Sequence, residues 1–155
     1  MPKLESHYGG VPNNLHTMAR RCQIVAGLFA LSDVVWAPGG TVTSEVKQLV
    51  AHIASKTAGS RYYQAHTIYG LSYTDIEKTR LAAIWEYESS PLFTGAEKEA
   101  MDFASAAVSV PNAVTDNLME QLSQHWDDDQ IVEILGVIAL FGFLNRWNDS
   151  MATPL

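Results

Sequence analysis

The chain has 155 residues, enough for one domain with a sizeable core, and we expect a single domain over residues 1–155. Its net charge of −7, without a basic run, argues against nucleic acid or an anionic membrane as a partner. Cys22 is the only cysteine, which excludes an intrachain disulfide, a cysteine-based zinc site and a two-thiol redox cycle within the chain. Residues 1–10 lack the apolar core of a signal peptide, and the apolar stretch 131–144 is short for a bilayer, so a cytoplasmic protein is expected.

The spacing of apolar residues is helical along nearly the whole chain, with no sustained alternation typical of strands. Residues 1–12 are predicted to form an extended arm. A first helix, with room for a break, is predicted from Asn13 or Asn14, either of which could cap it, to about Trp36. The run Ala37-Pro38-Gly39-Gly40 ends it.

Two further helices are predicted around a central break. Thr43 or Ser44 begins the first of them, and Ala58-Gly59 ends it. Ser60 is then expected to cap a helix that runs to about Tyr69. The apolar stripe of the helix before the break comprises Val46, Leu49, Val50 and Ile53.

The second half of the chain carries two capping boxes, Thr74-x-x-Glu77 and Thr94-x-x-Glu97. The predicted helices run from these boxes to about Tyr87 and Val108, from Thr115 to His125, and from an Asp127 cap to about Trp147. The last helix is apolar almost all round. We therefore expect it to be central in the fold and shared with a partner chain.

The segment Ala58-Gly59-Ser60-Arg61-Tyr62-Tyr63-Gln64-Ala65-His66 resembles the active-site motif of the alkylhydroperoxidase D and carboxymuconolactone decarboxylase superfamily. Ser60 and Tyr63 stand where that motif has its Cys-x-x-Cys pair. Residues 47–55 and 130–149 resemble two further blocks of the superfamily. The resemblance covers roughly Val11 to the C-terminus and implies an all-α domain of about six to eight helices, assembled as trimers or hexamers.

The same resemblance argues against the best-known reaction of the superfamily. Its peroxidases use a thiolate, a resolving thiol and a relay glutamate, and these positions fall on Ser60, Tyr63 and Gln48. None of the three can perform the corresponding redox or proton-transfer step. His66 is retained, and the resemblance implies a cofactor-independent decarboxylation of a lactone acid as the alternative type of reaction.

The residues themselves form a candidate acid–base site. Ser60, Tyr63 and His66 recur every three residues on one broad helix face, with Thr67 beside them. On the preceding helix Gln48, His52 and Ser55 form a polar stripe that could face them. An imidazole titrates near neutrality and a phenol can donate to an enolate oxygen, so His66 and Tyr63 are the expected acid–base groups. For Ser60 a simple capping role, and for His52 a structural role, are the competing interpretations.

Other polar residues have supporting or structural interpretations. Arg61, together with Lys56 and Arg80, is a candidate to bind a substrate carboxylate. Glu133 has two interpretations: an acid favoured by the helix dipole in the first turns of its helix, or a buried carboxylate bonded to a neighbouring helix or subunit, with Arg146 or a histidine as partner. Cys22 is expected to be a core thiol. Capping and solvation explain the acidic run at 127–129 better than a metal site does, so neither metal nor cofactor is expected.

Three functions remain open from the sequence. The first is a cofactor-independent lyase or isomerase for a small organic acid or lactone, using His66, Tyr63 and Ser60. The second is a ligand-binding or structural homologue without turnover. The third is a residual peroxidase that uses Cys22 alone.

Overall fold

The computed structural model describes residues 12–71 and 76–154, and every regular element in these ranges is a helix. The expected all-α fold is therefore confirmed. The predicted arm over residues 1–11 and the capping residue Thr74 lie outside the described residues. The elements are α2 (Asn13–Met18), η1 (Ala19–Arg21), α3 (Cys22–Val35), α4 (Ser44–Thr57), α5 (Arg61–Leu71), α6 (Lys78–Ala83), η2 (Ile84–Glu86), α7 (Gly95–Val108), α8 (Asp116–Leu122) and α9 (Asp128–Ser150).

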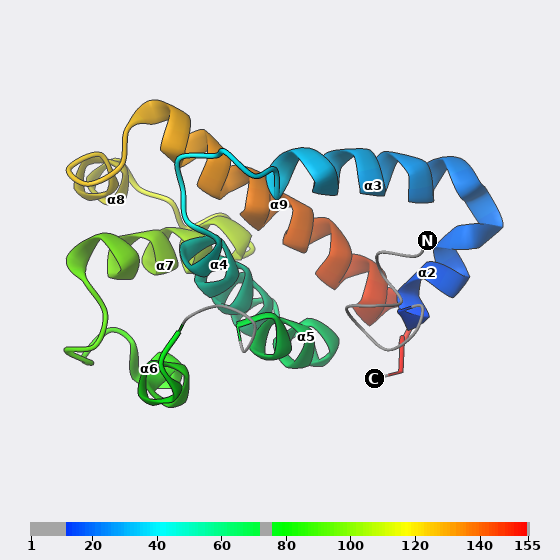
Figure 1. Cartoon of the computed structure of the whole chain (residues 1–155), viewed down its shortest axis with the longest axis horizontal. Helices are drawn as coiled ribbons and strands as arrows, with labels where there is room; N and C mark the ends of the chain where they lie inside the picture. The colour runs from blue at the N-terminus through cyan, green and yellow to red at the C-terminus, as the bar shows by residue number, and fades with distance from the viewer. Residues whose placement is uncertain (1–11, 72–75, 155) are drawn as a thin grey trace.

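Helices α4 and α9 form the centre of the molecule (Figure 1). α4 packs against α5, α7 and α9, and its predicted apolar stripe is buried: Leu49, Val50 and Ile53 are at most 1% exposed. α9 contributes Ile134 and Val137, which are fully buried in the same core. The prediction that α9 is central is confirmed, and burial of these side chains is the main stabilising term.

Local capping signals fix most helix starts as predicted. Thr94 accepts from the Glu97 backbone N–H while Glu97 accepts from that of Thr94, and Asp127 forms the same reciprocal pair with Gln130 before α9. Thr43 caps α4. The prediction that an asparagine caps the first helix is wrong, because Pro12 occupies that position without a side-chain bond.

Helix α9 has 23 residues and is long and apolar enough, by length and composition, to cross a membrane. The sequence-based expectation that this segment is too short to span a bilayer considered only its apolar centre, residues 131–144. A core helix passes the same test, and one face of α9 is buried against α4 and α7. Its other face exposes Val132, Leu135 and Phe143.

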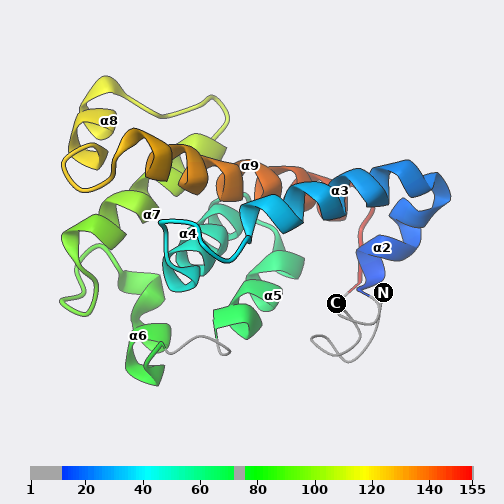
Figure 2. The ribbon, with the colours of Figure 1, turned by 45° about the horizontal axis from the view of Figure 1, so that its top comes forward.

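The segment α2–α3 forms an arch beside α9 (Figures 1 and 2). The predicted first helix is broken at Arg21, whose φ and ψ of −133° and 84° are not helical. At one end of the arch Trp36 packs edge-on against Phe141 of α9, with ring centroids 6.4 Å apart. At the other end Trp147 of α9 donates to the Thr17 hydroxyl of α2 over 3.0 Å. The arch therefore contacts α9 near both of its ends.

A buried ion pair anchors the end of α3 to the core. Lys47 Nζ on α4 lies 2.6 Å from Glu133 Oε1 on α9 and donates to the Val35 carbonyl over 2.8 Å. The other carboxylate oxygen accepts from the N–H groups of Thr41 and Val42. The second interpretation of Glu133, a bond to another helix, is confirmed, but its partner is Lys47 rather than Arg146 or a histidine.

The titration of Glu133 reflects this environment. Burial alone would raise the pKa of the Glu133 carboxyl, but the bond to Lys47 and the N–H groups of Val42 and Thr41 hold it below its usual value. The carboxyl is therefore ionised at neutral pH. Its role is to join α4, α9 and the loop after α3.

Candidate functional site

The arch encloses a cavity of about 730 Å³ against α4, α5 and α9. This size suits a small organic ligand. Its apolar wall comes from the arch, α5 and α9, and comprises Leu15, Leu28, Phe29, Trp36, Tyr62, Leu140, Phe141 and Leu144. Its polar lining residues are Asn14, Ser32, Asp33, Gln48, Tyr63, His66 and Thr67.

Tyr63 and His66, two of the expected acid–base residues, line this cavity together. The Tyr63 hydroxyl accepts a hydrogen bond from Asn14 Nδ2 over 2.8 Å, and its ring packs edge-on against Phe141. The His66 ring lies 4.3 Å from that of Tyr62 and 5.9 Å from that of Tyr63, measured between centroids. The arrangement presents a phenol and an imidazole on neighbouring turns of α5.

Burial lowers the pKa of His66 below its ordinary value of 6.5. The imidazole is consequently neutral at pH 7 and can accept a proton. This electrostatic state fits the predicted role of His66 as a base.

Gln48 and Thr67 also reach the cavity, but His52 lies behind Thr67. His52 Nδ1 is 2.8 Å from Thr67 Oγ1, which itself donates to the Tyr63 carbonyl over 2.7 Å. Because the hydroxyl has one proton, Nδ1 must carry the hydrogen in the bond between His52 and Thr67. His52 is fully buried and packs edge-on against Trp85, so the structure favours its structural role over a catalytic one.

Ser60 does not join Tyr63 and His66 at the cavity. Its side chain is fully buried directly before α5, and its hydroxyl has no hydrogen-bond partner. The expected capping bond is therefore absent, although Gly59, with φ of 74°, does break the chain as predicted. A buried hydroxyl without access to the cavity cannot contact a ligand there.

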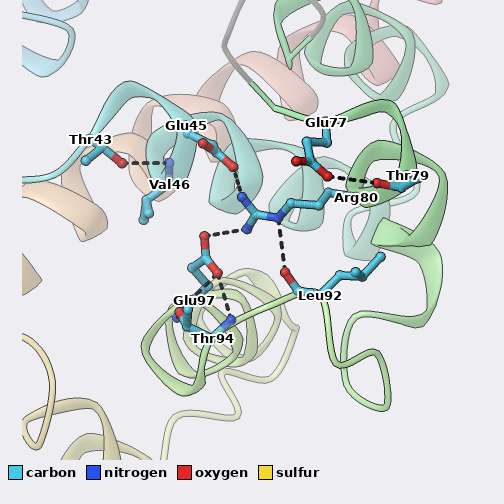
Figure 3. Close-up of polar contacts among 9 residues, drawn as sticks. All are labelled: Thr43, Glu45, Val46, Glu77, Thr79, Arg80, Leu92, Thr94 and Glu97. Carbon is cyan, nitrogen blue, oxygen red and sulfur yellow. Dashed lines mark hydrogen bonds and ion pairs between the residues drawn. The ribbon is translucent and has the colours of Figure 1, made fainter.

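The cations considered for a substrate carboxylate lie elsewhere. Figure 3 shows that Arg80 is held by Glu45, Glu97 and the Leu92 carbonyl. Arg61 is exposed on α5 and is not among the cavity-lining residues. The described lining contains no lysine or arginine, and its one formally charged residue is Asp33.

Three features of the site were missed from the sequence. Asn14 is a polar residue 49 positions from Tyr63, to which it bonds. Gly70 leaves room for Gln48, since a Cβ at residue 70 would lie 2.8 Å from Gln48 Oε1. Phe29 and Trp36, which form an aromatic wall of the cavity, were assigned from the sequence only to an apolar helix. The recurrence of apolar residues every three to four positions in that helix was the available signal.

Cys22, expected in the core, is exposed at the start of α3. It is not among the residues that line the cavity. A one-cysteine peroxidase cycle at this site would therefore have to work without a thiol in the pocket. The geometry gives no support to the third function.

Buried neutral His52 makes stability depend on pH. Burial, with a smaller contribution from Lys56, lowers its pKa to about 4, so in mildly acidic solution the unfolded chain binds a proton that the folded chain does not. Stability should fall by about 2 kcal/mol from about pH 7.5 to about pH 5, as integration of the linkage relation gives. Urea unfolding at the two pH values measures this. His52→Asn, which can keep a donor to Thr67, should flatten the dependence; an unchanged slope would contradict this assignment.

The chain is similar in sequence to a known protein over about half of its length. No family model matches the chain. The uncharacterized protein YnjA of Escherichia coli K12 is 33% identical over 75 residues, which span 48% of this chain and 41% of that protein. The chain thus matches less than half the length of this relative.

Solved structures match over nearly the whole chain. The debrominase Bmp8, solved without ligand and as a cysteine-to-alanine variant with 2,3,4-tribromopyrrole, aligns with a TM-score of 0.91 and 27% identity over 97% of this chain and 80–81% of Bmp8. A peroxidase-related protein with an alkylhydroperoxidase D core from Ralstonia eutropha JMP134 gives a TM-score of 0.83 and 20% identity, covering 96% of this chain and 78% of that one. A putative antioxidant defence protein from Agrobacterium tumefaciens gives a TM-score of 0.80 and 18% identity, covering 88% of this chain and 94% of that one.

The fold is therefore that of the alkylhydroperoxidase D-like proteins, as the motif implied. The chain shares this fold, and it lacks the Cys-x-x-Cys pair of the motif it resembles. The superfamily defines the scaffold, whereas the reaction has to be argued from the cavity.

Proposed function

We propose that this protein binds a small, planar, uncharged organic molecule in the cavity and moves a proton on it without a cofactor. This makes it a lyase or isomerase, with a lactone or a heteroaromatic ring favoured over a free acid. The observation that carries the proposal is the pairing of His66 and Tyr63 within a largely aromatic and aliphatic wall. The absence of a basic side chain from the described lining supports the uncharged ligand.

In the proposed reaction His66 accepts a proton from a carbon next to the ligand carbonyl. Tyr63 donates a hydrogen bond to the oxygen on which negative charge develops. Asn14 fixes the phenol by donating to its oxygen, and Gln48, which also lines the cavity, orients the ligand. The proton then returns to a different carbon in an isomerisation. In a lyase reaction the electron pair instead expels a leaving group from the adjacent carbon, a double bond forms, and the proton on His66 is released to water.

The similarity to Bmp8 supports the class of ligand rather than the reaction. That protein is described with a brominated pyrrole, which is a small, planar, largely apolar ring. We extend to this chain only the capacity for such a ring. Reductive removal of bromine needs an electron donor, and the motif here holds Ser60 and Tyr63 where the superfamily has cysteines.

Binding can be tested with 2,3,4-tribromopyrrole as the probe, because bromine quenches indole fluorescence at short range. Trp36 lines the cavity whereas Trp85 does not. We expect saturable quenching in the natural protein and in Trp85→Phe, and loss of most of it in Trp36→Phe. Quenching that is non-saturable, or equally strong without Trp36, would contradict a ligand in this cavity.

The competing function is ligand binding without turnover. The loss of both motif cysteines and of the relay glutamate favours it. It shares the cavity with the proposed enzyme but predicts no proton transfer. The His66 experiment described in the Discussion separates the two.

A further inference from the structure

The inner face of α3 forms one wall of the cavity. Its lining residues are Leu28, Phe29, Ser32, Asp33 and the C-cap residue Trp36. Residues three to four positions apart lie on one side of a helix, so these residues share one face. Trp36 packs edge-on against Phe141, which in turn packs edge-on against Tyr63. This row of rings connects the wall that carries Asp33 with the wall that carries Tyr63.

The polar side chains of the cavity differ in the hydrogen bonds that they already make. Asn14 donates to the Tyr63 hydroxyl, so its amide is engaged within the site. By contrast, Ser32, Asp33 and Gln48 make no side-chain hydrogen bond or ion pair with any residue in the described ranges 12–71 and 76–154. A ligand is oriented by the few polar groups that line its pocket. These three side chains are therefore the ones available to hold the polar groups of a ligand.

Asp33 is unfavourable for α3 itself. It stands in the last turn of the helix, where the dipole disfavours a negative charge, and the described cavity lining holds no lysine or arginine to pair with it. A carboxylate accepts hydrogen bonds and donates none. Asp33 thus supplies the cavity with an acceptor, and the group that complements it on an uncharged ligand is an N–H or O–H donor.

The groups on the two walls together define a pattern on the ligand. In the function proposed above, Tyr63 donates to a ligand carbonyl, so the ligand carries an acceptor toward α5. Asp33 requires a donor toward α3. A lactone ring has oxygen acceptors only, whereas a ring with both an N–H and a carbonyl meets the two requirements at once. Ser32 and Gln48 can each donate or accept, so they are compatible with either ligand.

On the basis of the function proposed above, we infer that the ligand is a planar, uncharged heterocycle with a ring N–H and a ring carbonyl, and that Asp33 selects it by accepting a hydrogen bond from the N–H. The corresponding lactone, which has an oxygen in place of the N–H, leaves the carboxylate without a donor. Asp33 is thus the residue that determines specificity. His66 and Tyr63 act on the carbonyl side of the ring, while Asp33 fixes its orientation.

Two isosteric rings test this role of Asp33. 4-Pyridone carries an N–H and a carbonyl at opposite ends of one planar ring, and 4-pyranone has an oxygen in place of the N–H. A titration followed by proton NMR of the ligand gives the dissociation constant of each ring. We expect the natural protein to bind 4-pyridone roughly 10-fold more tightly. This factor is the lower end of the range for a hydrogen bond to a charged group, because Asp33 is exposed and water competes for it.

Matched variants assign the preference to one side chain. Asp33→Ala should weaken 4-pyridone binding roughly 10-fold and leave 4-pyranone binding unchanged, whereas Asp33→Asn, which keeps an oxygen acceptor, should retain part of the preference. Asp149→Ala is the control, because Asp149 is also exposed in the last turn of a helix but is not among the cavity-lining residues. Thermal unfolding should show no loss of stability in Asp33→Ala, since the helix dipole disfavours the charge that is removed.

The outcomes separate this ligand class from the proposed function. Equal binding of the two rings by the natural protein, no detectable binding of 4-pyridone, or an unchanged preference in Asp33→Ala would overturn the recognition of an N–H by Asp33. Saturable quenching of Trp36 by 2,3,4-tribromopyrrole would in that case still support a ligand in the cavity. Absence of that quenching would instead overturn the proposed function itself.

Discussion

Replacing Glu133 by glutamine is expected to lower the free energy of unfolding by about 3–5 kcal/mol, the cost of leaving a buried charge unpaired. The charge left behind is the Lys47 ammonium, whose side chain is 4% exposed. Its remaining partner would be the Val35 carbonyl, at 2.8 Å. A neutral amide at residue 133 can still accept from the loop, so the loss isolates the ionic part of the interaction.

Lys47→Met should cost less than Glu133→Gln, because the two ions differ in burial. The Glu133 side chain is 19% exposed and keeps the N–H groups of Thr41 and Val42 as donors after the lysine is removed. The double variant leaves no unpaired charge and should recover most of the stability lost in Glu133→Gln. Urea unfolding of all four proteins gives the coupling free energy.

Glu99→Gln is the matched control for this series. Glu99 pairs with His125 over 2.8 Å, but the His125 side chain is 43% exposed, so its loss should cost below about 1 kcal/mol. The Glu133 contribution should also fade in acid. Because its folded-state pKa is lowered, its stabilisation is present above the unfolded-state pKa and is lost as the pH falls through the folded one. Equal costs for Glu133→Gln and Glu99→Gln would contradict a buried ionic anchor.

The elements that could be predicted from sequence are those set by local interactions. The boxes at Thr94 and Asp127 form as expected because both partners lie within one helical turn. The break at Gly59 also depends on one residue, whose φ is positive. The apolar stripe of α4 followed from helical spacing alone.

Only the α5 side of the site could be predicted from the sequence, because the side formed by the α2–α3 arch depends on contacts between distant segments. Tyr63 and His66 were identified from the motif, but Asn14, Phe29 and Trp36 reach them through the α2–α3 arch. Periodicity placed these residues on a helix and could not show which face the arch turns to α5. The position of Ser60 directly after the glycine break likewise suggested that it caps α5, yet tertiary packing buries its hydroxyl without a hydrogen-bond partner.

The site in the structure also differs from the sequence motif by which it was found. Ser60 and Tyr63 occupy the two cysteine positions, but only Tyr63 lines the cavity. The polar groups that converge are therefore His66, Tyr63, Asn14 and Gln48, none of which is a redox group. The scaffold is shared with peroxidase-related proteins, while proton transfer is the chemistry that we propose for this cavity.

Replacing His66 by glutamine is expected to slow proton exchange on a bound carbon acid by roughly 10²–10⁴-fold, the usual contribution of a positioned general base. A suitable probe is α-angelica lactone, an uncharged planar ring with an acidic carbon next to its carbonyl. Proton NMR in deuterated buffer measures deuterium incorporation at that carbon. His125→Gln serves as control, since His125 is exposed and is not among the cavity-lining residues.

The pH profile gives this experiment a second readout. Because burial lowers the pKa of His66 below 6.5, the midpoint of the decline in exchange rate with falling pH should lie below 6.5. Exchange that survives His66→Gln would remove His66 from the reaction. A lactone that binds in the cavity of the natural protein without any exchange would instead make the chain a ligand-binding protein, because binding requires the cavity whereas exchange also requires the base.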